Sequence, residues 1–441
     1  MIMIKEHLTG HIATNKQLQI ASGLSDRQVL RELKKLGDSV VKITSGKIPR
    51  YALAVNAFGV GDKINLWEVD EHGKHTCIAV IRPLSVGGYF VEKRTGGSHL
   101  LLGESKDGLY DDLPYFLRDM APQGFLGRKI AQEIATRNET FPTNPELWNN
   151  HHIGQYLLSN NDDAIGDLKF GDAANLRLKR TFNRSTPKKY PELAEQVMSE
   201  GAPMSSAGGE QPKFTTFCTE SQAHVIVKFS PKGDDANAKR WRDVLISEHY
   251  ANKVLNTGAT NATRTRLIEQ GERLYLESIR FDRVGEDGRC SMLSLKSVDA
   301  EFVGLGENWV NCLTNLKDNN LLSEQDLLNG KYLWLFGKLI NNTDMHLGNM
   351  SLSIHGDVFS LLPIYDMCSM GFVPKKNGEV LPFSYIKPDL PDVGFSNQQL
   401  ISVEKMVDEF WRLILEDARI SDEFRTFLMD FLSADPQAPI F

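Results

Sequence analysis

The stretch "INNTDMHLGNMSLSIHGDVFSLLPIYD", residues 340–366, decides the fold of the C-terminal half of the chain. It follows an apolar helical segment at 331–340, which the polar residues that come next would end. Residues 350–354 and 358–362 then read as two strands around a His-Gly-Asp turn, which predicts a hairpin. A hairpin brings its two outer ends together, so the residues just before and just after it are expected to lie close to each other.

Three oxygen-bearing side chains are placed by this hairpin: Asp344 at the helix exit, Asn349 before the first strand and Asp366 after the second. Phosphoryl transfer uses a carboxylate that orients the attacking hydroxyl and accepts its proton. Mg²⁺ takes one or two carboxylates from the protein together with substrate phosphates. The spacing Asp-x-x-x-x-Asn, followed by a separate Asp, is the one that protein kinases use. The alternative is that these residues only cap loops, which is the commonest role of Asn and Asp.

Two segments upstream could hold phosphates. A glycine turn at 205–213 would let backbone N–H groups approach an anion, although a plain hairpin explains this turn as well. Lys228 lies in the apolar strand "HVIVKFS" and would be costly to bury without a partner. Glu248, among the apolar residues of the next helix, is the expected partner, as in kinases that position the α- and β-phosphates this way. The alternative places Lys228 on the solvent face of its strand.

The order of the elements predicts a two-lobed α+β domain, because strands dominate from about 205 and helices after about 320. The strand "YLESIRFDR" at 275–283 would join the lobes and line an adenine pocket, with the backbone from Ile279 to Phe281 contacting the base. This expectation rests on the position of the strand more than on its residue types.

The segment ahead of this domain predicts a small antiparallel sheet between about 60 and 120, including a strand at 98–105. A helical region begins near 110, and the polar, loop-rich stretch from 140 to 200 predicts one helix at 191–201.

The composition, 41% hydrophobic and 24% charged, is that of a soluble globular protein, and 441 residues suggest several domains. The longest apolar runs fall far short of a membrane span, and the N-terminus has no long apolar core of a secretory signal. The five cysteines are scattered without a Cys-x-x-Cys pair, which argues against a disulfide framework or a zinc site. A cytoplasmic protein without a membrane partner is therefore expected.

The first 55 residues differ from the rest in charge, with nine Lys or Arg against four acidic residues. Two short helices joined by the turn "SGLS" and followed by a strand pair around "SGK" predict a winged helix-turn-helix. Its second helix would present basic side chains to DNA. Winged helices often bind paired half-sites as dimers, so a homodimer is a further expectation. A charged, solvated helix face on a protein-binding domain is the alternative. The basic side chains are Arg27, Arg31, Lys34 and Lys35.

The motifs taken in chain order resemble the HipA family of bacterial serine/threonine kinase toxins. They are SAGGEQPK at 206–213, VKF around Lys228, RFDR at 280–283, DMHLGN at 344–349 and YD at 365–366. The resemblance covers roughly residues 60–410, and the fused winged helix is similar to the YjjJ (HipH) branch of that family. Ordinary HipA proteins recruit a separate DNA-binding antitoxin instead.

The resemblance implies a two-lobed, protein-kinase-like α+β fold in four parts: 1–56 winged helix, 57–165 HipA-like N-terminal subdomain, 166–285 kinase N-lobe and 286–441 helical C-lobe. It also implies ATP and Mg²⁺ as cofactors, with Asp344 as catalytic base, Asn349 and Asp366 as metal ligands and Ser206 as the autophosphorylated residue. The residues implied to bind the nucleotide are Gly208, Gly209, Gln211, Lys213, Lys228, Glu248, Ile279, Phe281, Asp282, His346 and Tyr365.

The expected function is transfer of the ATP γ-phosphate to Ser or Thr of a protein, with a translation factor such as an aminoacyl-tRNA synthetase as the acceptor implied by the resemblance. A DNA-binding regulator whose kinase-like body senses nucleotide is the alternative, and a small-molecule kinase is a third. Two residues depart from the family pattern: Gly348 stands where a Lys is often found, and Glu210 puts an acid into the phosphate loop.

Overall fold

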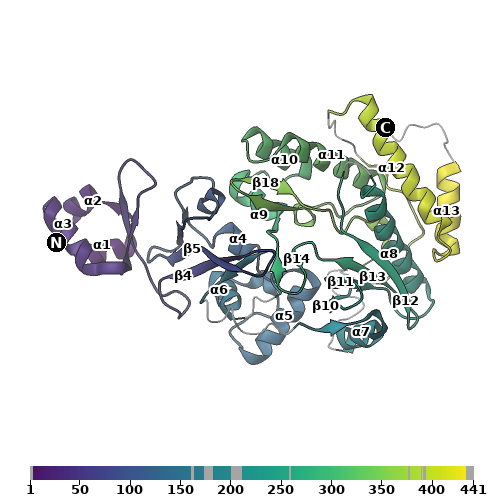
Figure 1. The fold of residues 1–441 in the computed structure, drawn as a ribbon, viewed down its shortest axis with the longest axis horizontal. Coiled ribbons are helices and arrows are strands. Elements are labelled where there is room, and N and C mark those ends of the chain that lie inside the picture. Colours follow the sequence, from purple (N-terminus) through teal and green to yellow (C-terminus); the bar gives the residue numbers. More distant parts are fainter. Residues whose placement is uncertain are drawn as a thin grey trace.

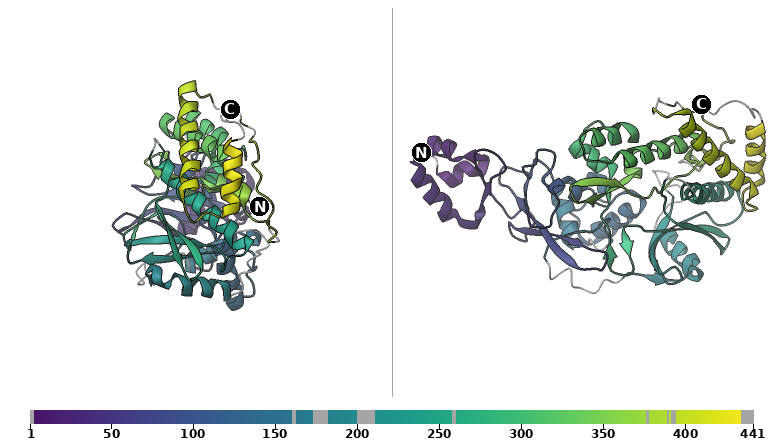
Figure 2. Two further views of the ribbon diagram at one scale, coloured as in Figure 1. Left: turned by 90° about the vertical axis from the view of Figure 1, so that its right-hand side faces the viewer. Right: turned by 45° about the horizontal axis from the view of Figure 1, so that its top comes forward.

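The computed structural model describes residues 3–159, 163–172, 182–199, 211–257, 260–375, 378–388, 390 and 394–433 of the chain. The molecule is elongated, with a small N-terminal unit at one end, a middle region next to it and a two-lobed body beyond (Figures 1 and 2). No described helix is both long enough and apolar enough to cross a bilayer.

The N-terminal unit consists of helices and a small antiparallel sheet around an apolar core of its own. The third helix buries Val29 and Leu33 against that core, and Gln28 accepts the Ser25 backbone N–H (2.9 Å) at its start. The opposite face of this helix is exposed and basic. The elements are α1 (Ile4–Gly10), β1 (Ala13–Thr14), α2 (Asn15–Ser22), α3 (Asp26–Leu36), β2 (Val40–Ile43) and β3 (Arg50–Leu53), with sheet order β1-β3-β2.

The N-terminal unit is fixed to the middle region by apolar and polar contacts together. Val41 of the small sheet and Leu84 of the middle region belong to one buried apolar cluster. The buried Arg82 guanidinium donates to the backbone carbonyl of Asp38 (2.6 Å). The basic face of α3 therefore has a set orientation relative to the body.

The middle region is a five-stranded antiparallel sheet covered by short helices. The strand expected at 98–105 is wrong: Leu100 and Leu101 are both buried on a single 3-10 turn, η2 (His99–Leu102), which Ser98 caps. A helix at 150–159 was not predicted, because its polar first turn hides the apolar pair Ile153 and Leu157. The elements are β4 (Ile64–Val69), β5 (His75–Pro83), β6 (Tyr89–Lys93), β7 (Leu109–Tyr110), α4 (Tyr115–Arg118), α5 (Gly124–Arg137), α6 (Asn150–Ser159) and β8 (Leu168–Phe170), with sheet order β7-β6-β5-β4-β8.

The first lobe of the body is a second five-stranded sheet packed against one long helix. In the pairing of its two central predicted strands, Lys213 stands directly opposite Lys228. The strand expected around Lys228 is confirmed, and the strand expected at 275–283 is observed at 273–279. The elements are β9 (Arg184–Ser185), α7 (Tyr190–Ser199), β10 (Lys213–Cys218), β11 (Ala223–Phe229), α8 (Ala236–Leu255), β12 (Thr265–Gln270) and β13 (Arg273–Ile279), with sheet order β12-β13-β11-β10-β9.

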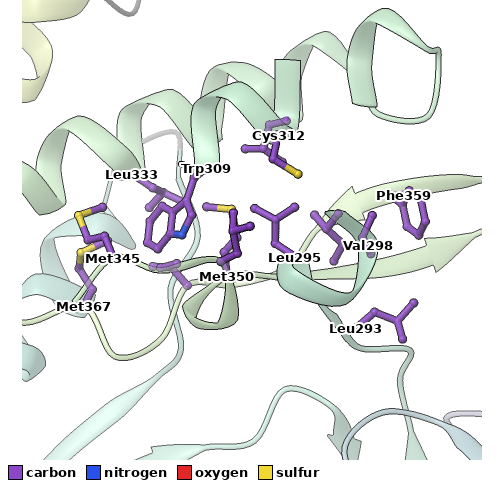
Figure 3. Close-up of a cluster of buried hydrophobic side chains, with 14 of the residues drawn as sticks. Leu293, Leu295, Val298, Trp309, Cys312, Leu333, Met345, Met350, Phe359 and Met367 are labelled. Atoms are coloured by element: carbon purple, nitrogen blue, oxygen red, sulfur yellow. The ribbon is translucent and has the colours of Figure 1, made fainter. Parts of the chain in front are cut away.

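The second lobe is mainly helical and contains the predicted hairpin. Figure 3 shows its core, in which Trp309 and Leu333 of two helices pack above Met345, Met350 and Met367, which come from the segments before and after the hairpin. The elements are β14 (Arg283–Val284), β15 (Gly288–Arg289), β16 (Leu293–Ser294), α9 (Leu295–Phe302), α10 (Trp309–Asp318), α11 (Glu324–Leu339), β17 (Ser351–His355), β18 (Val358–Leu361), α12 (Asn397–Glu416) and α13 (Asp422–Ser433).

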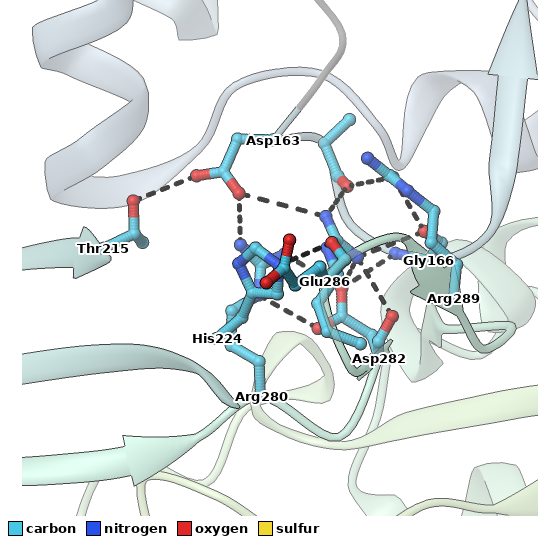
Figure 4. A network of polar contacts seen from close by, with 10 residues as sticks. Asp163, Gly166, Thr215, His224, Arg280, Asp282, Glu286 and Arg289 are labelled. Carbon is cyan, nitrogen blue, oxygen red and sulfur yellow. Dashed lines mark hydrogen bonds and ion pairs between the residues drawn. The ribbon is translucent and has the colours of Figure 1, made fainter. Parts of the chain in front are cut away.

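A network of buried charges joins the middle region to the segment between the two lobes (Figure 4). The Asp282 carboxylate pairs with Arg280 (2.9 Å) and Arg283 (2.6 Å) and accepts the Gly166 backbone N–H (3.1 Å). Arg280 also pairs with Asp163 of the middle region. Burial alone would raise the pKa of Asp282, but the two guanidinium charges hold it well below its usual range. The lobe-joining segment is thereby anchored to the middle region.

Asp167, one residue beyond Gly166, is buried, and burial together with the charge of Glu68 raises its pKa to about 7. The folded protein therefore holds this proton to a higher pH than the unfolded chain does, so the group lowers stability as pH rises from about 4 to about 7. We expect Asp167→Asn to remove this slope and to raise the free energy of unfolding near pH 8 by up to about 4 kcal/mol, the equivalent of raising a pKa by about three. Urea denaturation near pH 5 and pH 8 measures it, and an unchanged slope would contradict the assignment.

Candidate active site

Lys228 lies where the two lobes meet and binds two carboxylates at once. Its Nζ is 2.6 Å from Glu248 Oε2 on α8 and 2.5 Å from Asp366 Oδ1 after the hairpin. Lys228 and Glu248 are only 6% and 1% exposed, which excludes the solvent-face alternative for Lys228. Burial would lower the pKa of Lys228, but the charges of Asp366 and Glu248 outweigh it and raise that pKa. The predicted ion pair of strand and helix is therefore present, with Asp366 as a third member.

Asp366 reaches Lys228 because the chain after the hairpin is held against residues 261–263. The backbone of Ile364 exchanges hydrogen bonds with Asn261 and Thr263 (2.9 Å each). Asp366 itself has a φ of 53°, in the left-handed region, where Asp is one of the better tolerated residues. Burial would raise the pKa of Asp366, but Lys228 and Lys213 lower it to about 2. Its carboxylate is thus charged at neutral pH.

The loop from 341 to 349 positions Asp344 through its backbone. The Asn342 side chain accepts the Asp344 backbone N–H (3.1 Å), and the Asn349 amide donates to the Asp344 carbonyl (2.8 Å). Trp309 of the core in Figure 3 donates its indole N–H to the His346 carbonyl (2.8 Å). The Asp344 carboxylate, whose side chain is 51% exposed, accepts only a longer bond from the Asn349 amide (3.4 Å) among these contacts.

His346 and Gly348 form a close contact beside Asp344. His346 Nδ1 accepts the Gly348 backbone N–H (3.0 Å), so the proton of the neutral ring lies on Nε2. That nitrogen is 3.8 Å from Asp344 Oδ1. A Cβ atom on residue 348 would lie 2.9 Å from His346 Cε1, closer than side chains pack. The glycine that departs from the family pattern therefore makes room for the imidazole ring.

One cleft of about 1660 Å³ is lined by the ion pairs of Lys228 and by the 343–349 part of the loop. Small-molecule sites typically measure about 300–1,000 Å³, so this cleft exceeds what one nucleotide would fill. It extends from the first lobe across the 341–349 loop to the helices of the middle region. Of the residues that sequence singled out, it brings together Gln211, Lys213, Lys228, Glu248, Asp344, His346, Asn349 and Asp366.

The oxygens in the cleft suit a divalent cation bound together with phosphates. The Asn349 amide nitrogen is engaged with Asp344, which leaves its carbonyl oxygen as the acceptor toward the cleft. Asp366 uses one carboxylate oxygen for Lys228. No cluster of three or more His, Cys, Asp or Glu suited to a metal is found in the part of the chain that the structure describes. One carboxylate and one amide oxygen match Mg²⁺, which takes the rest of its ligands from phosphates and water.

Four residues expected at the nucleotide lie outside the walls of this cleft. Asp282 is buried in the charge network of Figure 4, where both carboxylate oxygens are engaged. The Tyr365 hydroxyl donates to the Gly348 carbonyl (3.1 Å), so this ring supports the 341–349 loop from behind. The Phe281 ring lies 5.9 Å from the Tyr365 ring, and Ile279 ends β13. Ser206, Gly208, Gly209 and Glu210 lie outside the described residues.

Sequence reasoning missed several residues that shape the site. Asn342 could have been found, since Asn commonly binds the N–H two residues ahead of it. Trp309 carried no signal, because its partner is a backbone carbonyl 37 residues away. Trp241 lies seven residues before Glu248 on α8 and so faces the same cleft. Nothing in the sequence predicts that this face of α8 lines a cleft.

Comparisons with known proteins agree with this architecture. A family model described as "YjjJ-like toxin, middle domain" matches residues 60–179, and one described as "HipA-like C-terminal domain" matches residues 205–414. The Toxin YjjJ of Escherichia coli (strain K12) is 31% identical over 423 residues, which cover 93% of this chain and 91% of that protein.

Among solved structures, a chain of the Shewanella oneidensis MR-1 toxin–antitoxin complex of HipA, HipB and operator DNA shares the fold. The two chains have a TM-score of 0.58 at 15% identity, with 86% of this chain and 96% of that one covered. The identity and coverage of the Escherichia coli relative decide the family: the chain belongs to the YjjJ-like toxins of the HipA family.

Proposed function

We propose that this protein is an ATP-dependent serine/threonine protein kinase of the HipA type. The observation that carries the proposal is the meeting of Lys228, Glu248 and Asp366 in the same cleft as Asp344 and Asn349. Protein kinases place a strand lysine, a helix glutamate, a catalytic aspartate, an asparagine and a metal-binding aspartate in these roles.

Each residue then has a separate role in the transfer. Lys228, fixed by Glu248, binds the α- and β-phosphates of ATP, and Lys213 on the neighbouring strand adds positive charge beside them. Asp344 orients the acceptor hydroxyl and takes its proton as the oxygen attacks the γ-phosphorus. Asn349 and Asp366 would hold Mg²⁺, which when bound neutralises charge on the phosphates.

The finer points of the proposal rest on the family resemblance. They are autophosphorylation of Ser206, binding of the adenine by the backbone of 279–281, and a translation factor such as an aminoacyl-tRNA synthetase as acceptor. The division into 1–56, 57–165, 166–285 and 286–441 is proposed with them. The direct test is transfer of labelled γ-phosphate by the full chain with Mg-ATP, to itself and to added protein. Nucleotide binding without any transfer would overturn the kinase proposal in favour of a nucleotide-sensing regulator.

Replacing Gly348 by Ala tests the contact with His346. The added methyl group would displace the imidazole ring from Asp344, so we expect phosphate transfer to fall about tenfold. The free energy of unfolding should change by less than about 1 kcal/mol, because residue 348 lies in a loop. Gly10→Ala is the matched control, since a Cβ there meets nothing within 4 Å. Full activity of Gly348→Ala would show that the ring position is irrelevant.

A second function, DNA binding by the N-terminal unit, is supported by α3. Arg27, Arg31 and Lys34 are exposed on one face of this helix, opposite the buried Val29 and Leu33. Within the described ranges these three cations make no ion pair, whereas Lys35 pairs with Glu32 (2.7 Å). We propose that this unit is a winged helix that binds DNA and is part of the same chain as the kinase-like body. The Shewanella complex contains HipB and operator DNA as components separate from HipA.

The double substitution Arg27→Ala/Arg31→Ala is expected to weaken DNA binding and to reduce the dependence of log K on log salt by about two, one for each phosphate that an arginine no longer neutralises. Gel retardation and fluorescence titration at several salt concentrations measure both. Lys405→Ala, on α12 at the far end of the molecule (Figure 1), is the control. Absence of retardation by the wild type at low salt would contradict DNA binding.

A further inference from the structure

The cleft that contains Asp344 has an apolar wall on one side. We use this term for Trp241 of α8 together with Met370, Val373, Leu381 and Ile386 of the segment that follows Asp366. Leu381 and Ile386 are 42% and 53% exposed. Apolar side chains gathered beside polar groups commonly mark a binding surface.

The segment that carries the apolar wall is anchored from behind. The buried Arg240 donates to the carbonyl oxygens of Phe372 (3.1 Å) and Leu381 (2.9 Å). Its guanidinium lies 3.5 Å from the centre of the Phe383 ring, which stacks on Phe424. Arg240 therefore fixes the backbone of this segment, including that of Leu381, while the Leu381 side chain remains free to contact a ligand.

The apolar wall is also tied directly to the loop of Asp344. The Asn341 carbonyl accepts the Gly371 N–H (2.9 Å), and the Asn341 side chain accepts the Ile386 N–H (3.3 Å). Asn341 precedes Asp344 by three residues. Both ends of the apolar wall are thus held at a fixed position relative to the loop of Asp344, whose carboxylate would bind the acceptor hydroxyl.

The size of the cleft indicates what kind of acceptor lies there. Its volume is about 1660 Å³, and besides Lys228 and Asp344 it is lined by Arg118 and Trp148 of the middle region. A small-molecule acceptor would leave most of this space empty. An extended polypeptide, which presents side chains to both sides, would fill it.

We propose that the apolar wall binds a bulky apolar side chain of an extended polypeptide, close in sequence to the Ser or Thr that receives phosphate. This inference rests on the proposed kinase function and assigns its substrate class. In the transfer, the acceptor oxygen forms a bond to the γ-phosphorus, the bond from that phosphorus to the bridging oxygen of ADP breaks, and the hydroxyl proton passes to Asp344.

The experiment uses the full chain with Mg-ATP and a library of Ser-centred peptides with Leu, Ala, Lys or Glu at each flanking position. Wild type should prefer Leu over Ala at one or more positions by about tenfold or more in kcat/KM, as for an apolar pocket. Ile386→Glu should abolish this preference and favour Lys at the same position, a reversal that loss of structure would not produce. Ile401→Glu, on α12 and 48% exposed, is the matched control and should behave as wild type.

Each outcome decides between the two proposals. Phosphorylation of peptides without an apolar preference, or a preference that survives Ile386→Glu, overturns the assignment of the apolar wall and leaves the kinase proposal intact. Autophosphorylation without phosphorylation of any peptide also overturns this assignment, since the acceptor is then not an extended segment. Absence of all transfer overturns the kinase function itself.

Discussion

Asp344→Asn is expected to lower phosphate transfer about a thousandfold while the affinity for ATP changes by less than about threefold. The amide keeps the shape of the side chain but cannot accept the proton of the attacking hydroxyl, and a general base typically contributes about 10²- to 10⁴-fold. The Asn342 side chain and the Asn349 amide bind the backbone N–H and carbonyl of residue 344, and these two hydrogen bonds survive the change. The longer bond from Asn349 to Asp344 Oδ2 (3.4 Å) can be kept by the oxygen of an Asn side chain. Single-turnover transfer from labelled ATP measures the rate, and titration with a fluorescent nucleotide measures the affinity.

A matched control is Asp318→Asn on α10, whose side chain is 65% exposed and lies outside the cleft. It should transfer phosphate at the wild-type rate. Transfer by Asp344→Asn within a few-fold of wild type would remove Asp344 from the role of base and leave the site without an assigned one.

Lys228→Met is expected to have the second largest effect, lowering kcat/KM for ATP about 10²- to 10³-fold, because one close, desolvated charge on the phosphates is removed. It should also destabilise the protein by roughly 3 kcal/mol, since removal of one member of a buried ion pair leaves the other unpaired. Glu248, 1% exposed, and Asp366 would then face each other without a cation between them.

The double variant Lys228→Met/Glu248→Gln separates these two effects. It removes the unpaired charge, so we expect much of the stability to return while phosphate transfer stays low. Urea denaturation and single-turnover kinetics on the wild type, the two single variants and the double variant form a double-mutant cycle for stability and for activity. Recovery of activity together with stability would mean that Lys228 acts only as a structural residue.

The hairpin and the ion pair of Lys228 with Glu248 could be predicted because each depends on a local pattern. Alternation around a Gly-containing turn indicates a hairpin, and a lysine within an apolar strand needs an acid. The position of Asp366 followed from the hairpin alone. Its contact with Lys228 was not predicted, because it also requires the backbone of Ile364 to pair with residues 261–263.

Other features depend on contacts between segments far apart in the sequence. The charge network that includes Asp282 needs Asp163 and Gly166 from the middle region, which the sequence does not place, so Asp282 was expected at the nucleotide from the family resemblance. The apolar wall needs Arg240 of α8 to anchor a segment more than a hundred residues later. The expected strand at 98–105 failed for a simpler reason: a short apolar run fits a buried strand and a helical turn equally well, and here Leu100 and Leu101 are both buried on one turn.

Mass spectrometry of the full-length wild type and of Asp344→Asn after incubation with Mg-ATP tests the phosphate loop, the base and the metal ligands together. We expect the wild type to gain phosphate on the peptide that contains Ser206, and Asp344→Asn to gain none. Equal phosphate on both proteins would contradict the assignment of Asp344 as the catalytic base. A wild type that binds ATP but transfers no phosphate to itself or to added protein acceptors would contradict the kinase proposal itself.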